Sequence, residues 1–272
     1  MSHNLLITGG AGFIGTNFVH FWLERHPRDR LIVLDALTYA GNKGNLDIFL
    51  GRENVVFVNG SICDQGLVER LFTEYKIDRV VNFAAESHVD RSIEIPLNFI
   101  DSNIIGTYNV FEAARQAGVR RIIYASSGAV ISGYENQFPY QEIAQGEYEK
   151  VPRSWSNLTH ETQVWPQGIY GCTKVWGEAL ARHFSDSSDM SFICLRIGAV
   201  NASDQPNQDR QFSVYCSQEN IVSMVEACIK APERIKFDIF YVVSDNKWSY
   251  RDMEHARKML GYQPKGQAED YR

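Results

Sequence analysis

Short apolar runs alternate with amphipathic stretches along most of this 272-residue chain. Apolar runs of four to eight residues are typical of strands buried on both faces of a parallel sheet, whereas apolar residues three or four positions apart are typical of helices. The pattern predicts strands at 5–8, 31–34, 55–58, 80–83, 122–125, 192–195 and 237–243. It predicts helices at 13–25, 65–75, 97–117, 170–184, 218–230 and 250–260, the third ending at Gly118 as its C-cap.

Strands that alternate with helices form βαβ units with right-handed crossovers. We therefore expect an α/β fold, a Rossmann-type doubly wound parallel sheet.

Two stretches do not follow this alternation of strands and helices. Residues 134–168 are rich in polar and aromatic side chains without a clean period, and they interrupt a strand-to-helix connection, which predicts an active-site loop. Residues 199–211 are polar and predict a second loop.

Composition and charge exclude several classes of partner. The net charge of -6 and the pI near 5.7 argue against nucleic acid and anionic membranes. No stretch approaches 18 apolar residues, and residues 1–4 lack the features of a signal peptide. The five cysteines are isolated from one another and from histidines at metal-ligand spacing. We expect a cytoplasmic protein with reduced core cysteines and no metal.

A glycine-rich turn follows the first strand and opens the first helix. In 9–15, Gly12 lets the backbone approach a pyrophosphate and Gly15 lets the helix pack close to the strand, while the helix N-terminus attracts phosphate. Asp35 closes the second strand, where a carboxylate can accept both hydroxyls of an adenosine ribose. This carboxylate repels a 2′-phosphate and Ala36 is not basic, so the sequence predicts NAD rather than NADP.

A serine, a tyrosine and a lysine form a candidate catalytic group. Tyr170 and Lys174 share one face of a predicted helix, and Ser127 follows the strand at 122–126, at the carboxyl edge of the sheet where ligands bind. An ammonium group and a positive nicotinamide ring both lower the pKa of a phenol, which makes Tyr170 a candidate general base. Ser127 is placed to hold the reacting oxygen.

The motifs at 8–15, 82–85, 103, 126–127 and 170–174 together resemble those of an extended short-chain dehydrogenase/reductase, of the NAD-dependent epimerase/dehydratase family. The resemblance implies that Ser127, Tyr170 and Lys174 form the catalytic triad. It implies an NAD-binding Rossmann domain with the catalytic residues at 1–196, a small C-terminal substrate-binding portion at 197–272, and a homodimer formed by the helices at 97–117 and 169–184. The implied cofactor-binding residues are Gly9, Gly12, Phe13, Ile14, Gly15, Asp35, Ile62, Ala84, Ala85, Tyr170 and Lys174.

The two halves of the chain resemble different branches of that family. Residues 1–118 are similar to dTDP-glucose 4,6-dehydratases, especially at 34–42 and 85–92. Residues from about 103 onward are similar to uronate dehydrogenases, which oxidise the C1 hydroxyl of an aldohexuronic acid to a lactone. The short segment of about 75 residues after Arg196 favours a small, free substrate.

Gly128 and Ala129 distinguish the two reactions. Dehydratases carry an Asp-Glu pair at these positions to eliminate water, and neither residue here can exchange a proton. Asp90, Glu86 and His160 are candidate substitutes for that pair.

The substrate contacts match uronate dehydrogenases in part. Arg210 stands where an arginine binds the uronate carboxylate, and Ser87 where a serine binds the substrate. Gly128 replaces a substrate-binding asparagine and Ala199 a serine, while Ser61 replaces an aspartate that contacts adenine.

The sequence thus favours an NAD-dependent oxidoreductase that acts on a hydroxyl of a sugar or sugar acid. The alternative is a nucleotide-sugar epimerase or dehydratase that keeps and recycles its NAD. A third hypothesis is a non-catalytic NAD sensor, against which the intact triad argues.

Overall fold

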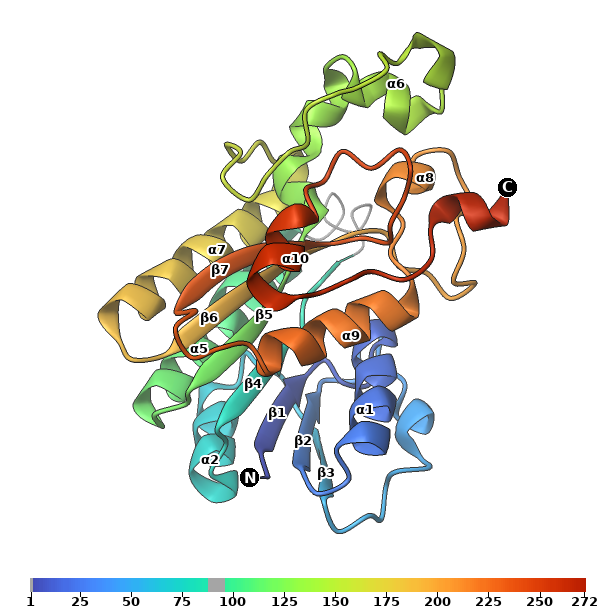
Figure 1. The fold of residues 1–272 in the computed structure, drawn as a ribbon. Helices are drawn as coiled ribbons and strands as arrows, with labels where there is room; N and C mark the ends of the chain where they lie inside the picture. The colour runs from blue at the N-terminus through green and yellow to red at the C-terminus, as the bar shows by residue number, and fades with distance from the viewer. Residues whose placement is uncertain (1, 88–95) are drawn as a thin grey trace.

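Seven parallel strands form the single sheet of the computed structural model, which describes residues 2–87 and 96–272. The strand order is β3-β2-β1-β4-β5-β6-β7 (Figure 1). The strands are β1 (Asn4–Thr8), β2 (Arg30–Asp35), β3 (Val55–Asn59), β4 (Arg79–Asn82), β5 (Arg121–Ser127), β6 (Ser191–Ile197) and β7 (Phe237–Val242). The chain thus has the expected doubly wound fold, and the order reverses between β1 and β4.

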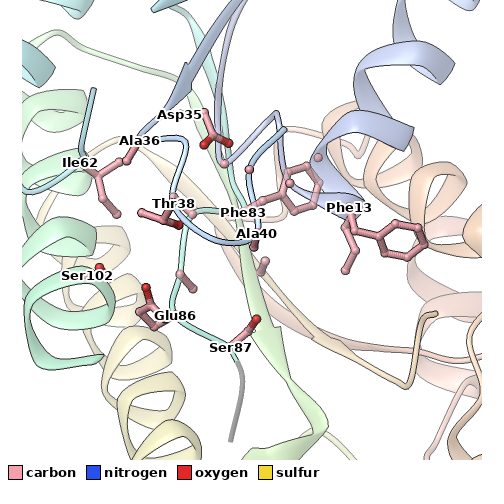
Figure 2. A pocket seen from close by; sticks show the side chains of 18 of the residues that line it. Phe13, Asp35, Ala36, Thr38, Ala40, Ile62, Phe83, Glu86, Ser87 and Ser102 are labelled. Atoms are coloured by element: carbon pink, nitrogen blue, oxygen red, sulfur yellow. The ribbon is translucent and has the colours of Figure 1, made fainter. Parts of the chain in front are cut away.

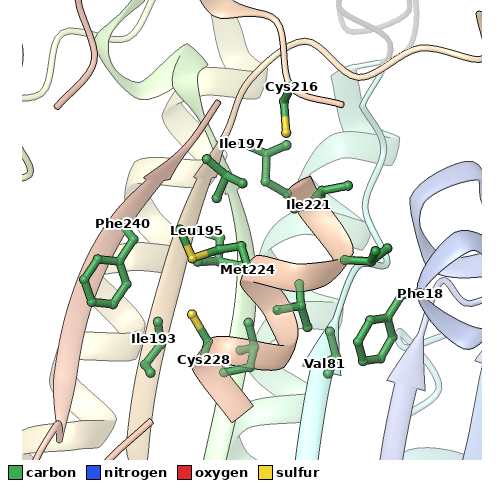
Figure 3. Packing of buried hydrophobic residues seen from close by; sticks show 14 of the residues in the cluster. Phe18, Val81, Ile193, Leu195, Ile197, Cys216, Ile221, Met224, Cys228 and Phe240 are labelled. Carbon is green, nitrogen blue, oxygen red and sulfur yellow. The ribbon is translucent and has the colours of Figure 1, made fainter. Parts of the chain in front are cut away.

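Helices cover both faces of the sheet. Alternate strand residues point to opposite sides, so Leu5 and Ile7 pack in one core and Leu6 in the other. The first core includes α1 (Phe13–Arg25) and α9 (Gln218–Ile229), whose Met224 lies over the strands (Figure 3). The second core includes α2 (Gln65–Tyr75), α5 (Thr107–Gln116) and α7 (Gly168–Ser187).

The long helix expected before Gly118 contains a π-helical turn. It runs through α4 (Pro96–Ile100), the π segment η2 (Asp101–Gly106) and α5. Gly118 has a φ of +71°, the left-handed conformation expected after a helix C-terminus. π-Turns within α-helices often lie at functional sites, and this one contains Asn103, whose buried side chain contacts the active-site region.

The interval expected to be an irregular loop contains short helices. Within 134–168 these are the end of η3 (Gly128–Asn136), α6 (Tyr140–Gln145) and η4 (Tyr148–Lys150). They form because side chains such as Ile143 are fully buried and aromatic rings, including those of Tyr134 and Tyr140, pack together. Sequence periodicity missed these helices because each is too short to show a period.

The C-terminal segment completes the fold with β7, α9 and three further helical elements, α8 (Gln211–Val214), α10 (Glu254–Leu260) and η5 (Ala268–Tyr271). Helix α10 begins four residues later than the pattern predicts. Arg251 instead forms a parallel bridge with Leu158, and the Asp252 carboxylate accepts a hydrogen bond from the Glu254 N–H at the start of the helix.

The cysteines are unpaired, as expected, but not all of them belong to the core. Cys194, Cys216 and Cys228 are buried, whereas Cys172 is exposed on α7 and Cys63 is partly exposed. The expectation of core cysteines was therefore wrong for these two, because Cys172 lies on the outward face of an amphipathic helix. Among the described helices, none combines the length and hydrophobicity needed to cross a bilayer.

A buried ion pair joins α7 to β6. Arg196 donates from Nε to Glu178 Oε1 at 3.0 Å and from Nη2 to Oε2 at 2.8 Å, and both side chains are almost completely buried. Ser126 Oγ donates to the same carboxylate at 2.7 Å. Because β5, β6 and α7 meet at these three side chains, the pair fixes the helix that carries Tyr170 and Lys174.

We expect Arg196→Met to lower the free energy of unfolding by about 3–5 kcal/mol, because Glu178 is then a buried charge without its partner. Urea denaturation measures this change. The matched control is Arg182→Met, which breaks the exposed pair with Asp186 on the same helix and should cost less than about 1 kcal/mol. Equal losses in the two variants would contradict the role assigned to the buried pair.

Candidate active site

A cavity of about 600 Å³ opens at the carboxyl edge of the sheet. Residues that follow β1, β2, β3, β4 and β6 line it, together with the end of β5 and the first turns of α7. Figure 2 shows Asp35 toward one end of this cavity and Glu86 and Ser87 toward the other. Since the strands are parallel, their carboxyl ends meet at one edge, which is where open α/β sheets bind ligands.

The glycine turn brings backbone close to the cavity. Gly9 has a φ of +69°, and a Cβ on it would lie 2.7 Å from the Ala84 backbone nitrogen. A Cβ on Gly15 would lie 2.2 Å from the Gly9 carbonyl oxygen, so only glycine allows α1 to pack this closely on the turn. The result is a cradle of main chain at the helix N-terminus, which fits the pyrophosphate of a dinucleotide.

Asp35 holds the loops around the cavity and also faces it. Its Oδ2 accepts a hydrogen bond from the Ala11 N–H at 2.9 Å and its Oδ1 accepts one from the Leu37 N–H at 2.8 Å. A carboxylate oxygen has more than one lone pair, so both oxygens retain the capacity to accept ribose hydroxyls. The buried position of this negative charge also disfavours a 2′-phosphate, as expected for an NAD site.

The three candidate catalytic side chains all line the cavity. Lys174 Nζ donates to the Ala125 carbonyl at 2.8 Å and lies 5.7 Å from the centroid of the Tyr170 ring, one helical turn away. Ser127 Oγ accepts from the Ala129 N–H at 3.1 Å. Neighbouring residues in a strand point to opposite sides, so Ser126 binds Glu178 while Ser127 is available to the cavity.

Burial controls the acid–base properties of this group. Desolvation lowers the pKa of Lys174 from 10.5 to about 7, although Glu178 acts in the opposite direction. Desolvation also raises the pKa of Tyr170, and the hydrogen bond with Ser127 offsets this only in part. In the chain alone the pKa of Tyr170 is therefore raised rather than lowered, because burial outweighs the hydrogen bond with Ser127.

Asn103 connects the cavity wall to α7. Its Oδ1 accepts from the Glu86 N–H at 2.8 Å, and its Nδ2 donates to the Glu86 carbonyl at 2.9 Å and to Thr173 Oγ1 at 3.1 Å. The buried amide therefore holds the segment after β4 against the helix of Tyr170 and Lys174. These contacts give a physical reason for an asparagine at position 103 of the family motifs.

Most of the residues expected from the sequence meet at the cavity. Those that line it are Gly9, Gly12, Phe13, Ile14, Gly15, Asp35, Ile62, Ala84, Ala85, Ser87, Ser127, Tyr170 and Lys174. Gly128 and Arg210 do not line it. Arg210 forms a two-pronged ion pair with Glu135, at 2.6 Å from Nε and 2.8 Å from Nη2, because η3 lies alongside the segment before α8.

The three candidate substitutes for the dehydratase acid and base differ in location. Glu86 lines the cavity, His160 does not, and Asp90 lies outside the described residues. The ring of His160 stacks on His255 with centroids 3.8 Å apart. These two histidines and Asp238 have ligand atoms within 4.8 Å of one another, a grouping that sequence spacing missed because it joins three distant segments.

Further lining residues come from the loop after β2, the loop after β6 and the π-turn. Sequence reasoning gave no role to Thr38, Tyr39, Ala40, Gly41, Ser102, Gly198 or Val200. For the loop residues, only their place in the chain could have indicated a role, since both loops directly follow the carboxyl ends of predicted strands. Ser102 had no such signal, because it reaches the cavity only through the π-helical turn.

Comparison with known proteins gives one family over almost the entire chain. Residues 6–271 match the family described as GDP-mannose 4,6 dehydratase. A dTDP-glucose 4,6-dehydratase of Mycobacterium tuberculosis is 41% identical over 179 residues, 65% of this chain and 47% of the relative. Low-salt glycan biosynthesis protein Agl12 of Haloferax volcanii is 37% identical over 193 residues, 71% of this chain and 55% of the relative. The chain thus spans about half the length of these curated relatives.

Solved structures of the same fold include enzymes of both kinds expected from the sequence. A variant of uronate dehydrogenase from Agrobacterium tumefaciens complexed with NAD has a TM-score of 0.78 at 27% identity, covering 100% of this chain and 88% of that one. The dTDP-glucose 4,6-dehydratase DesIV from Streptomyces venezuelae has a TM-score of 0.76 at 24% identity, covering 98% and 94%. At that identity the second match supports the fold alone.

The buried Lys174 makes stability depend on pH. The folded chain binds this proton with a pKa of about 7 and the unfolded chain with the ordinary value of 10.5, so between these values the unfolded state holds more protons. Stability due to this group therefore rises with pH in that window. From pH 7 to 9, we expect the unfolding free energy of the wild type to rise relative to that of Lys174→Met, by up to about 1.4 kcal/mol per pH unit.

Urea denaturation of both proteins at each pH measures this slope. Lys258→Met, which removes an exposed lysine from α10, is the control for loss of charge and should show no comparable slope. A difference between the wild type and Lys174→Met that is flat with pH would show that the lysine is not desolvated.

Proposed function

The chain belongs to the family described as GDP-mannose 4,6 dehydratase, among the NAD-dependent extended short-chain dehydrogenases, and on this premise we propose that it oxidises a hydroxyl of a sugar or sugar acid with NAD. The observation that carries the proposal is the convergence of Ser127, Tyr170 and Lys174 on the cavity beside the glycine turn. The C-terminal portion 197–272 supplies substrate-binding surface, as Gly198 and Val200 already line the cavity.

NAD fits the main-chain cradle at Gly9 and Gly15 and the carboxylate of Asp35. When bound, NAD would supply a hydride acceptor for the substrate carbon. Ala84 and Ala85, which line the cavity together with Tyr170 and Lys174, would hold its nicotinamide ring. The small side chains of the two alanines leave room for a flat ring against the backbone.

Tyr170 accepts the proton of the substrate hydroxyl, and Ser127 orients that oxygen by a hydrogen bond. Lys174 stabilises the phenolate by its charge, which requires it to be protonated. Because burial brings the pKa of Lys174 to about 7, binding partners that accept its hydrogen bonds strengthen this role. The Ala125 carbonyl accepts a hydrogen bond from this ammonium, whose nitrogen lies 5.7 Å from the centroid of the Tyr170 ring.

Net oxidation is favoured over elimination by the residues after Ser127. Gly128 and Ala129 start η3 and offer no acid or base. At these positions the site therefore lacks the acid and base that remove water in dehydratases, so the oxidised sugar leaves unaltered at its other carbons, together with NADH.

A second candidate is a nucleotide-sugar epimerase or dehydratase with recycled NAD. Glu86 favours it, because this carboxyl group lines the cavity in a buried position and can exchange a proton. The identity with dTDP-glucose 4,6-dehydratases supports it as well. The two candidates differ in whether NADH accumulates in solution.

A homodimer is also proposed, formed by the face of α4, η2, α5 and the start of α7. Leu97 is 71% exposed, and Ile105 and Tyr108 are about half exposed on the same continuous helix. Ile169 at the start of α7 is also exposed. Apolar side chains grouped on two helices are typical of a surface that a second copy covers.

We expect Tyr170→Phe to reduce NADH formation by about 10²- to 10⁴-fold, because the general base is lost, while NAD affinity stays within a few-fold. Absorbance at the NADH band with a panel of free sugars and uronates measures turnover, and calorimetry measures NAD binding. Tyr75→Phe, on α2 away from the cavity, is the matched control. Turnover that survives in Tyr170→Phe would rule out the proposed base.

The same panel separates the two candidate reactions. Stoichiometric NADH with an oxidised sugar supports the dehydrogenase. Conversion of a nucleotide sugar without net NADH supports the second candidate, and we then expect Glu86→Gln to abolish the conversion but not NAD binding.

A further inference from the structure

Two histidines and an aspartate from three distant segments meet where α10 packs against β7. His160 belongs to the insertion between β5 and α7, Asp238 to β7 and His255 to α10. One ligand atom from each residue lies within 4.8 Å of the other two. None of the three lines the cavity, so the proposed function gives this group no role. The sequence expectation of no metal rested on local spacing, which does not detect ligands that the fold brings together.

Strand β7 holds the ring of His255 in place. Its Nε2 lies 2.7 Å from Oδ1 of Asp238, and its face stacks on the ring of Phe240 with centroids 5.0 Å apart. Asp238 and Phe240 are two positions apart in a strand and therefore point to the same side. The carboxylate is fixed in turn, because its Oδ1 also accepts from the Ile239 N–H at 2.8 Å. A nitrogen and an oxygen donor thus already face one another.

Main-chain contacts bring His160 to the same place. The Leu158 N–H donates to the Tyr250 carbonyl at 2.7 Å, and the Leu158 carbonyl accepts from the Asp252 N–H at 3.0 Å. His160 follows this connection by two residues, and His255 lies in the first turn of the helix that begins just after it. The two imidazole rings stack with centroids 3.8 Å apart and an angle of 12° between their planes.

His160 contributes a ring nitrogen that no other group of the described chain uses. Its Nδ1 is buried and has no hydrogen-bond partner within residues 2–87 and 96–272. The carboxylates of Glu161, Asp252 and Asp238 act on this ring electrostatically, and all three favour a positive charge there. The side chains of His255 and Asp238 are 18% and 10% exposed, so solvent reaches the group.

We propose that His160, Asp238 and His255 bind a zinc ion, with water as the remaining ligand. Two imidazoles and a carboxylate are donors typical of zinc, whereas magnesium and calcium prefer oxygen donors alone. The ion takes the place of the proton between His255 Nε2 and the Asp238 carboxylate. This site goes beyond the proposed function, because it joins the insertion to the C-terminal segment at a distance from the cavity. Such a link stabilises the folded chain.

Binding requires the ring of His160 to turn. A tetrahedral zinc ion lies in the plane of each imidazole that it binds and holds its ligand atoms about 3.3 Å apart, so two stacked rings cannot share it. The second side-chain torsion of histidine has a broad energy profile, and no hydrogen bond at Nδ1 opposes the turn. His255 and Asp238 need to separate only slightly.

Calorimetric titration with Zn²⁺ tests the site on the full chain, freed of metals with EDTA and then of the chelator, without NAD or sugar. We expect one ion per chain. His160→Gln should weaken its binding by at least about 10- to 100-fold, since loss of a ligand costs no less than loss of a group that orients one. His255→Gln and Asp238→Asn should do the same. His183→Gln, which removes an exposed histidine from α7, is the matched control and should bind as the wild type does.

Two further measurements separate binding from folding. In EDTA, the Tm of His160→Gln should stay within a few degrees of the wild type, because the substitution breaks no hydrogen bond at Nδ1. Zn²⁺ should then raise the Tm of the wild type and of His183→Gln but not that of His160→Gln. Co²⁺ in place of Zn²⁺ should give the visible absorption of a four-coordinate ion, whereas Mg²⁺ should not bind.

A wild type that shows no saturable binding of Zn²⁺ would overturn the inference. The same holds if His160→Gln and His255→Gln bind the ion as tightly as the wild type, since the ion then lies elsewhere on the surface. Failure of the proposed function looks different, because it appears as a lack of NADH formation, and the zinc titration uses neither NAD nor a sugar.

Discussion

The reversal of strand order at β1 is the constraint on which the site depends. β1 pairs with β2 on one side and with β4 on the other, and the connections that follow β1 and β4 lead to helices on opposite faces of the sheet. The space between these departures is the cavity. Gly9 lies against the backbone of Ala84, just past β4, so no side chain of the glycine fills the space there.

The candidate catalytic residues add a buried charge to this scaffold together with polar contacts that hold it. Lys174 is buried at a position where its charge is disfavoured, and the Ala125 carbonyl satisfies one donor. The Arg196–Glu178 pair fixes the same helix one turn further along, with Ser126 bound to the same carboxylate. Strand β5, which carries Ser127, and helix α7, which carries Tyr170, are therefore joined through hydrogen bonds to the Glu178 carboxylate.

Sequence predicted the parts of this site that depend on local chemistry. The glycine turn, Asp35 at a strand end and the spacing of Tyr170 and Lys174 each have a physical reason within a few residues. The pairing of Arg210 with Glu135 across 75 positions has no local signal, and neither has the grouping of His160 with His255. The short helices after Ser127 were missed because burial by distant side chains, rather than periodicity, forms them.

Gly128 shows how such long-range partners change the interpretation of a single position. Read alone, the glycine after Ser127 is only the loss of an asparagine that binds substrate in uronate dehydrogenases. In the fold, the missing side chain is the space occupied by Arg251, so the loss at one position and the buried charge at the other are one feature. The position after Ser127 is therefore packed by a residue of the C-terminal segment, and this residue forms a bridge with Leu158. The insertion between β5 and α7 thereby holds a segment distant in the sequence against the start of η3.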